Sequence, residues 1–269
     1  MEVEFGYQNI NAVAELFCEV FGDSVSYINI LRNTGFLNPE NTYAVVDNNV
    51  LISALITPIY TMRWNEQEWD CPYICYICTR KSFQGKGYAT HLIQATIKDL
   101  KSRGYCFTTL IPANDALFNF YQQFGFQDMF YADILSYEPL LVNKNFFALN
   151  IWDRYKVDSY YNIYYERYSD IPFCIMKSFD LFYGSVVENG QVFTDGESII
   201  FTTEGKRSVL VRDYGGTPDF QSFCDFLQKP LSVYIPGNSE RIGMGLVLDY
   251  SKIDNSIYNK IGFMNGMFN

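Results

Sequence analysis

Residues 77–89 read ICTRKSFQGKGYA, which predicts the end of a strand, a glycine turn and the start of a helix. Gly85 and Gly87 let the backbone of such a turn come close to a ligand. The first N–H groups of the helix that follows have no partner within that helix, and the helix dipole adds partial positive charge. The stretch therefore predicts a binding site for a pyrophosphate or a similar anion.

The charge around this turn differs from that of the rest of the chain. Six basic residues and one acid lie between Arg80 and Arg103, so the segment has a net charge of +5. The full chain of 269 residues has a net charge of −10, which leaves −15 outside the segment. A local anion site and a helix with a solvated basic face both explain the basic segment. The acidic remainder argues against nucleic-acid binding and suits cationic partners.

The glycine spacing excludes two common phosphate-binding loops. A Walker A loop needs Gly-Lys-Ser/Thr after four intervening residues, and this order does not occur in residues 77–89. A Rossmann turn needs a third glycine, which is also missing from the Gly85-x-Gly87 pair.

Hydrophobic periodicity predicts an α/β (α+β) fold with a mixed central sheet flanked by helices. In the first half we expect helices over 10–21, 24–34, 88–103 and 114–124, and strands over 42–46, 50–62, 71–79, 106–111 and 127–137. After Glu138-Pro139 we expect a tyrosine-rich helical region over 150–187, strands over 198–203 and 208–213, a helix over 218–227, and strands over 231–235 and 244–248. The change in character predicts two domains, residues 1–138 and 139–269.

Two motifs in the first domain resemble those of the GCN5-related N-acetyltransferase (GNAT) family. Gln84-x-x-Gly87-x-Ala89 matches the family signature Arg/Gln-x-x-Gly-x-Gly/Ala. The segment 114–126, NDALFNFYQQFGF, is similar to the family's Asn…Phe-Tyr-x-x-x-Gly-Phe. The resemblance covers about residues 1–138 and includes the order of the elements.

The resemblance implies an acyl-CoA N-acyltransferase fold in which acetyl-CoA, the cosubstrate, lies between two splayed strands, here 71–79 and 106–111. Strand groups would hold the pantetheine arm and the thioester, and the glycine turn would hold the pyrophosphate. The cofactor-binding residues that it implies are Ile77, Cys78, Thr79, Gln84, Gly85, Lys86, Gly87, Tyr88, Ala89, Thr90 and Asn114.

The family transfers the acetyl group by direct attack of an amine on the thioester. Tyr121 matches the family position that often protonates the leaving thiolate, and we expect it to be the catalytic acid. The general base is left open among several carboxylates. The candidates are Glu19, Asp23, Glu68, Asp70 and the terminal carboxylate of Asn269.

The second domain has a shape similar to the first without its signature, which resembles the tandem arrangement of the Eis family. We expect this degenerate GNAT-like lobe to bind no cofactor and to shape the acceptor cleft; the chain is too short for the third, sterol-carrier-like domain of that family. The expected activity is transfer of an acetyl group to a primary amine of a cationic acceptor, either a small molecule or a protein. A non-catalytic CoA-binding sensor or partner-binding module is the alternative, and oligomerisation is left open.

The cysteines raise one further alternative. Cys71-x-x-x-Cys75-x-x-Cys78 has the spacing of an iron–sulfur motif, but a strand over 71–79 would prevent the three thiols from wrapping a cluster. We therefore expect no metal. Seven cysteines without framework spacing, no signal sequence, and a longest apolar stretch far below the ~18 residues of a membrane helix predict a cytoplasmic protein without a membrane partner.

Overall fold

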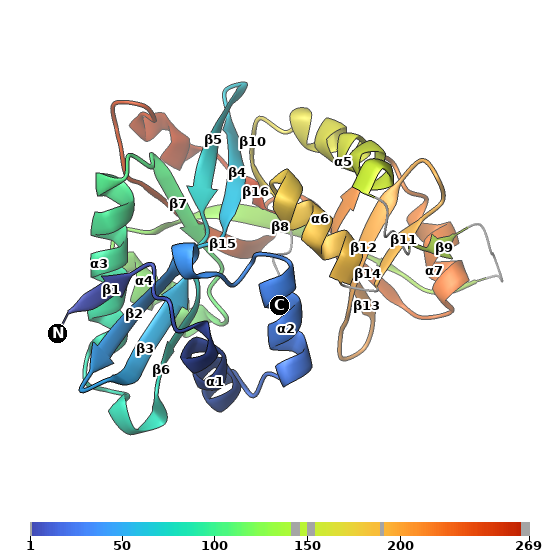
Figure 1. Ribbon diagram of the computed structural model, residues 1–269. Coiled ribbons are helices and arrows are strands. Elements are labelled where there is room, and N and C mark those ends of the chain that lie inside the picture. The colour runs from blue at the N-terminus through green and yellow to red at the C-terminus, as the bar shows by residue number, and fades with distance from the viewer. Residues whose placement is uncertain (1, 141–145, 150–153, 189–190, 265–269) are drawn as a thin grey trace. The chain divides into compact units, whose positions relative to one another are not determined.

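The computed structural model describes residues 2–140, 146–149, 154–188 and 191–264 (Figure 1). The chain divides into two units. The first comprises Met1–Thr61, Trp69–Asp128 and Gly243–Asn259, and the second comprises Met62–Glu68, Met129–Ile242 and Lys260–Asn269. The chain is of the α/β class, as predicted, with helices packed on sheets in each unit.

Four strands form the main sheet of the first unit. They are β1 (Val3–Phe5), β2 (Thr42–Asp47), β3 (Val50–Ile56) and β6 (Cys75–Thr79), in the order β1-β2-β3-β6 with antiparallel pairing throughout. Asn48 and Asn49 have φ values of 49° and 63°, which makes the tight turn between β2 and β3. β6 lies at the edge of this sheet, so one of its sides is not used by β3.

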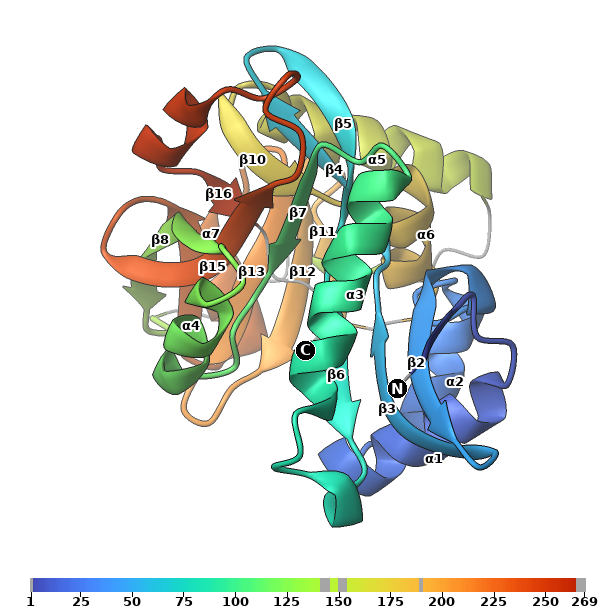
Figure 2. The same cartoon turned by 90° about the vertical axis from the view of Figure 1, so that its left-hand side faces the viewer.

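Amphipathic helices cover this sheet. α1 (Ile10–Phe21) buries Val13, Leu16 and Phe17, and α3 (Tyr88–Ser102) buries Leu92, Ile93, Thr96 and Leu100. Both helices contact β3 and β6, and Figures 1 and 2 show them on opposite faces of the sheet. α2 (Val25–Asn33) begins after its N-cap Ser24, whose hydroxyl accepts a hydrogen bond from the Tyr27 N–H at 3.1 Å.

A β-bulge bends β6 in its middle. Ile56 of β3 pairs with Cys75, and Ala54 pairs with Cys78, so β6 has one residue more than its partner over this interval. Tyr76 lies in the bulge with a φ of 53°, a left-handed conformation that is rare for a bulky residue. The bulge turns the Tyr76 ring toward α1, where its centroid lies 4.7 Å from that of Phe17.

Two long strands of the sequence prediction are each broken in the structure. The expected strand 50–62 divides into β3 and β4 (Ile59–Trp64) at Pro58, which has no N–H for a continuous ladder. The expected strand 71–79 divides into β5 (Gln67–Pro72) and β6. Between β4 and β5 the chain makes a tight turn at Asn65 and Glu66, both with positive φ.

The remaining elements predicted for the first unit are present, and Gly243–Asn259, which the prediction placed in the second domain, also belongs to this unit. β7 (Phe107–Leu110) pairs antiparallel with the end of β15 (Glu240–Val247). α4 (Asp115–Gln122) begins at Asn114, whose side chain accepts a hydrogen bond from the Leu117 N–H at 3.2 Å. β8 (Gln127–Tyr137) then leads the chain into the second unit.

The second unit contains a sheet in the order β8-β14-β13-β12-β11-β9. Its strands after β8 are β9 (Phe147–Ala148), β11 (Val192–Thr194), β12 (Ile199–Glu204), β13 (Val209–Gly215) and β14 (Leu231–Pro236), with α7 (Phe220–Leu227) before β14. The predicted succession of two strands, a helix and two strands is therefore confirmed by β12, β13, α7, β14 and β15.

The helical region predicted over 150–187 is wrong in its middle. It consists of α5 (Arg154–Ser169), the strand β10 (Phe173–Met176) and α6 (Phe179–Glu188). Pro172 disfavours helix at the preceding residue, and the apolar run that follows is fully buried and pairs in parallel with β16 (Phe263–Met264). Tyrosines of α5 pack in the core of this unit, where Tyr164 and Tyr168 have no exposed surface.

Candidate active site

The strand, turn and helix expected at 77–89 are all present in the first unit. β6 is followed by one turn of 3₁₀ helix (Lys81–Phe83), and α3 begins after Gly87. Gly85 and Gly87 have φ values of 74° and 82°, which other residues adopt only with strain. No side chain of the described residues caps this end of α3, so its first N–H groups face outward without a side-chain acceptor.

A cavity of about 380 Å³ lies at this turn. Most of the predicted cofactor-binding residues line it, namely Ile77, Cys78, Thr79, Gln84, Gly85, Gly87, Tyr88, Ala89 and Thr90. Val20, Phe83 and Phe120 also line it and were not predicted. Val20 comes from α1 and Phe120 from α4, so no local motif around the glycine turn could have identified them.

Lys86 and Asn114, the other two predicted residues, are not part of the cavity wall. The Lys86 ammonium lies 5.0 Å from the centroid of the Phe83 ring and donates a hydrogen bond to the Ser82 carbonyl at 3.3 Å. Its charge is thus close to the turn. Asn114 caps α4, which accounts for its place in the motif without a ligand.

The strands β6 and β7 separate beside the cavity. Just before β6, Tyr73 forms an isolated parallel bridge with Thr109 of β7, and the Ile74 N–H donates a hydrogen bond to the Thr109 carbonyl at 2.9 Å. Beyond this point β6 pairs with β3 and β7 pairs with β15, and each strand ends its own sheet. The edge of β6 that carries Ile77 and Thr79 is therefore available to an extended ligand.

Arg80 is held by protein groups next to the turn. Its guanidinium donates hydrogen bonds to a Glu19 carboxylate oxygen at 2.5 Å and to the Leu51 carbonyl at 3.1 Å. The second carboxylate oxygen of Glu19 accepts a hydrogen bond from the Lys81 N–H at 3.2 Å. Glu19 therefore balances the charge of Arg80 and fixes the end of β6 against α1.

Tyr121 lies near the last turn of α4. Its side chain is 8% exposed and packs edge-on against Phe120 and Phe126. Burial, and to a smaller extent the Cys75 thiol, raise the pKa of Tyr121 to about 12, so its hydroxyl is protonated at neutral pH. Among the described residues no group forms a hydrogen bond with this hydroxyl.

Comparisons with known proteins agree with this geometry. Residues 6–129 match the model of the acetyltransferase (GNAT) domain family. The first unit of this chain carries a GNAT domain. None of the curated proteins matches the sequence.

Solved structures extend the similarity of fold beyond the GNAT domain. A GCN5-related N-acetyltransferase from Anabaena variabilis is similar with a TM-score of 0.71 and 13% identity, over 93% of this chain and 74% of that one. A probable N-acyltransferase of unknown function from Enterococcus faecalis has a TM-score of 0.69 at 10% identity, over 92% and 72%. Eis1 from Mycobacterium abscessus has a TM-score of 0.64 at 11% identity, over 94% and 75%. The chain thus shares the fold of these proteins over more than nine-tenths of its length.

The acidic residues considered as a base of the GNAT reaction differ in their surroundings. Glu19 is paired with Arg80, as described above. In the second unit, Glu68 accepts hydrogen bonds from Arg63 at 3.2 Å and from the Tyr165 hydroxyl at 2.7 Å. Asp70 is exposed, and Asn269 lies outside the described residues. Asp23 has a buried Oδ2 atom without a hydrogen-bond partner among the described residues.

The cysteine motif lies on two strands, with Cys71 at the end of β5 and Cys75 and Cys78 in β6. All three are free thiols, and burial is the main factor that raises their pKa values. In the described part of the chain, no group of three histidine, cysteine or acidic residues is arranged to hold a metal ion.

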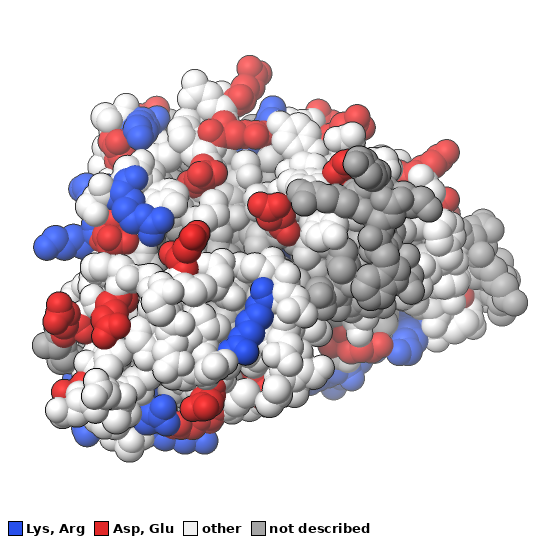
Figure 3. All heavy atoms as spheres, viewed as in Figure 1, with Lys and Arg blue, Asp and Glu red and all other residues white. Residues whose placement is uncertain are grey.

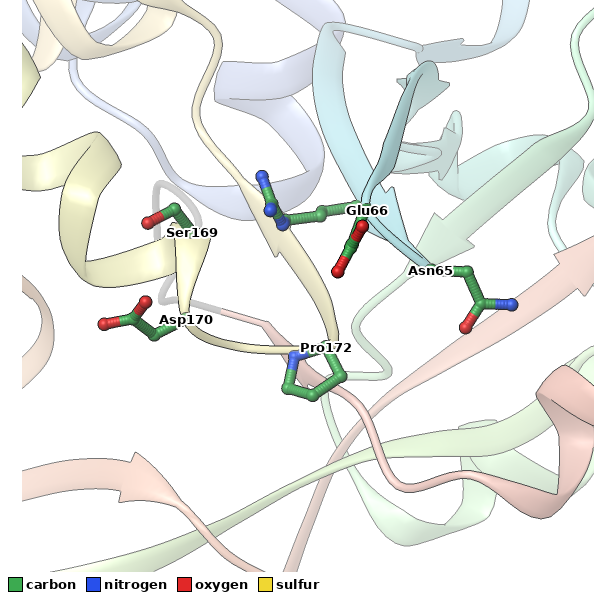
Figure 4. A pocket seen from close by; sticks show the side chains of 6 residues that line it. Asn65, Glu66, Ser169, Asp170 and Pro172 are labelled. Carbon is green, nitrogen blue, oxygen red and sulfur yellow. The ribbon is translucent and has the colours of Figure 1, made fainter.

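A second cavity, of about 420 Å³, lies in the second unit. Figure 4 shows Asn65 and Glu66, from the turn between β4 and β5, opposite Ser169 and Asp170 near the end of α5. Arg63 also lines it, and its guanidinium is paired with Glu68. None of the residues that we predicted to bind a ligand lines this cavity.

The surface and the helices show two further properties. On the face in Figure 3, acidic and basic side chains are interspersed over a surface of uncharged residues. Within the described ranges, each helix is too short or too polar to span a bilayer.

Proposed function

We propose that the protein is an acetyl-CoA-dependent N-acetyltransferase that acts on a primary amine of a cationic acceptor. The observation that carries the proposal is the cavity at the start of α3, where a glycine turn, free helix N–H groups and the edge of a splayed strand meet. These groups match the three parts of the cosubstrate: an anionic pyrophosphate, an extended amide-containing arm and a thioester.

Different residues of the site would bind the pyrophosphate and the pantetheine arm of acetyl-CoA. The N–H groups from Gln84 to Ala89 would hold the pyrophosphate, with Lys86 adding positive charge from the edge of the turn. The β6 edge at Ile77 and Thr79 would pair with the pantetheine amides. The Gln84 side chain donates a hydrogen bond to the Thr79 carbonyl at 3.1 Å, which fixes the turn relative to the strand.

Acetyl-CoA supplies an activated acyl group. The transfer forms a C–N bond and breaks a C–S bond, so the amine must lose a proton and the departing sulfur gains one. Tyr121 is protonated at neutral pH and is the group we assign to donate that proton. A strand N–H near the bulge in β6 would stabilise negative charge on the carbonyl oxygen.

The second domain, residues 139–269, is proposed to bind no second cosubstrate. Its strand β13 is followed by Gly215-Gly216 without a Gln/Arg-x-x-Gly-x-Gly sequence. A Cβ on Gly216 would lie 2.6 Å from the Glu197 carbonyl oxygen, so protein atoms already fill the space at this turn. At Gly87, by contrast, a Cβ would meet no atom within 4 Å.

A calorimetric titration with acetyl-CoA tests the proposal, followed by an assay of thiol release with a mixture of amines. We expect one site per chain, salt-sensitive affinity and amine-dependent release of thiol. Absence of acetyl-CoA binding would overturn the proposal. Binding without release of thiol in the presence of any amine would support a sensor instead.

A further inference from the structure

One carboxylate joins α1 to the segment where β6 leads into the glycine turn. One oxygen of Glu19 accepts a hydrogen bond from the Arg80 guanidinium at 2.5 Å, and the other accepts one from the Lys81 N–H at 3.2 Å. The side chains of Glu19 and Arg80 are each 29% exposed, so the pair is partly shielded from solvent. Both partners of the carboxylate come shortly before Gln84, where the proposed pyrophosphate site begins.

Glu19 caps the 3₁₀ turn that connects β6 to the glycines. The Lys81 N–H is the first amide of this turn, and the Phe83 N–H closes it by donating a hydrogen bond to the Arg80 carbonyl at 2.8 Å. Arg80 occupies the N-cap position, but its side chain makes no capping hydrogen bond. The acceptor for the first amide therefore comes from α1 instead of from the turn itself.

Two parts of the proposed cosubstrate site depend on the position of this turn. Phe83 is its last residue and lines the cavity. The Ser82 carbonyl accepts a hydrogen bond from the Lys86 ammonium at 3.3 Å, and this ammonium lies 5.0 Å from the centroid of the Phe83 ring. A shift of the turn would therefore move part of the cavity wall and the positive charge between the two glycines.

The same pair fixes α1 relative to the sheet. The Arg80 Nε atom donates a hydrogen bond to the Leu51 carbonyl at 3.1 Å, so the guanidinium connects Glu19 of α1 with β3. Val20, the next residue of α1, lines the cavity, as does Ile77 of β6. The contact between Glu19 and Arg80 thus holds two walls of the cavity at a fixed separation.

We propose that Glu19 is a positioning residue for acetyl-CoA binding, which acts through Arg80 and Lys81. The proposal rests on the proposed function, since it concerns the same site. By its charge alone, a carboxylate close to an anion site would weaken the binding of an anion. Positioning has the opposite sign, because removal of Glu19 would leave the turn uncapped and the site no longer held in its binding geometry.

Calorimetric titrations with acetyl-CoA separate the two effects. Glu19→Ala and Arg80→Ala remove charges of opposite sign, so charge alone would shift their affinities in opposite directions. We expect instead that each variant binds acetyl-CoA at least about tenfold more weakly, as for loss of a hydrogen bond between charged groups. The double variant should bind within about threefold of the weaker single variant, because both substitutions break the same contact.

Glu15→Ala is the matched control, because Glu15 is an exposed carboxylate on α1 and the variant changes the net charge equally. It should bind acetyl-CoA with wild-type affinity, and alanine preserves the helix in both variants. Glu19→Gln keeps the length of the side chain and one acceptor oxygen, so it should bind more tightly than Glu19→Ala. In steady-state kinetics of Glu19→Ala, the KM for acetyl-CoA should rise by at least about tenfold and kcat should change far less.

Wild-type or tighter binding of acetyl-CoA by Glu19→Ala would overturn the inference, and so would shifts of opposite sign in the two single variants. A fall in kcat with unchanged affinity for acetyl-CoA would also overturn it, and would assign Glu19 to proton transfer. A wild type that binds no acetyl-CoA would instead overturn the proposed function.

Discussion

Tyr76 donates a hydrogen bond to Tyr27 at 3.2 Å from a strand position with a φ of 53°. The left-handed conformation is the local cost of the bulge, of the order of 1–2 kcal/mol for a residue other than glycine. The contacts of the ring with Phe17, Phe21 and Phe36 offset this cost. The bulge thus ties the strand that carries the proposed thioester site to the helices that precede it.

The glycine turn gives the first prediction. Gly87→Glu would place a carboxylate at the first N–H groups of α3, where the proposed pyrophosphate lies, and affinity for acetyl-CoA should fall by at least about a hundredfold, or about 2.7 kcal/mol. Gly104→Glu is the control, because Gly104 has a φ of 83° and also has open space around its Cβ position. Calorimetry should show wild-type affinity for the control. Equal loss in both variants would mean that backbone strain, and not the site, controls binding.

Tyr121→Phe gives the second prediction. The variant keeps the ring contacts with Phe120 and Phe126 and removes only the hydroxyl. Affinity for acetyl-CoA should stay within about twofold, whereas kcat should fall about 10²- to 10⁴-fold, the usual contribution of a positioned acid. Tyr105→Phe, which removes a hydroxyl that accepts a hydrogen bond from Arg103 at 3.4 Å, should retain the wild-type kcat. A wild-type kcat in Tyr121→Phe would remove Tyr121 from the mechanism.

The glycine turn of this site could be predicted because the sequence signals that encode it are local. The turn at 84–89 is encoded by glycine, helix and strand signals within a dozen residues, and the structure places all of its residues except Lys86 around one cavity. Val20 and Phe120 come from distant helices, so tertiary packing alone brings them there. The pairing of Glu19 with Arg80 is likewise a tertiary fact, and the sequence could only present the candidate carboxylates as equals.

The errors in the fold have a similar origin. The strand β10 within the predicted helical region 150–187 is four buried residues long, and its partner β16 is about ninety positions away. Such a short apolar run fits a helix or a strand equally well until the partner is known. The breaks at Pro58 and between Pro72 and Cys75 were signalled by proline, but the β-branched and apolar residues around them favoured continuous strands.

Alkaline pH should weaken the fold in part through Tyr121. Burial raises its pKa to about 12, against about 10 in an unfolded chain. The folded state therefore holds the phenol proton of Tyr121 more tightly than the unfolded chain does. The resulting contribution to the free energy of unfolding, up to about 3 kcal/mol, is fully present below about pH 10 and is lost as the pH rises to about 12. Urea unfolding from about pH 9 to about pH 11 should show a shallower loss for Tyr121→Phe than for the wild type. Coincident slopes would contradict the pKa shift.

Breaking the buried ion pair between Lys177 and Asp213 should destabilise the second unit. The two side chains are 4% and 2% exposed, and the Tyr168 hydroxyl also donates a hydrogen bond to Asp213 at 2.8 Å. Lys177→Met would leave a buried carboxylate without its cation, so the free energy of unfolding should fall by about 3–5 kcal/mol. Thermal or urea unfolding measures the change.

Two control variants test whether the loss of stability comes from the unpaired charge of Asp213. Adding Asp213→Leu to Lys177→Met removes the unpaired charge, and the double variant should recover at least half of the lost stability, because desolvation of a charge and not loss of volume causes the defect. Lys229 pairs with Glu204 at 2.9 Å with both side chains more than half exposed, so Lys229→Met should change the free energy of unfolding by less than about 1 kcal/mol. A double variant less stable than Lys177→Met would show that packing around Asp213, rather than its charge, sets the cost.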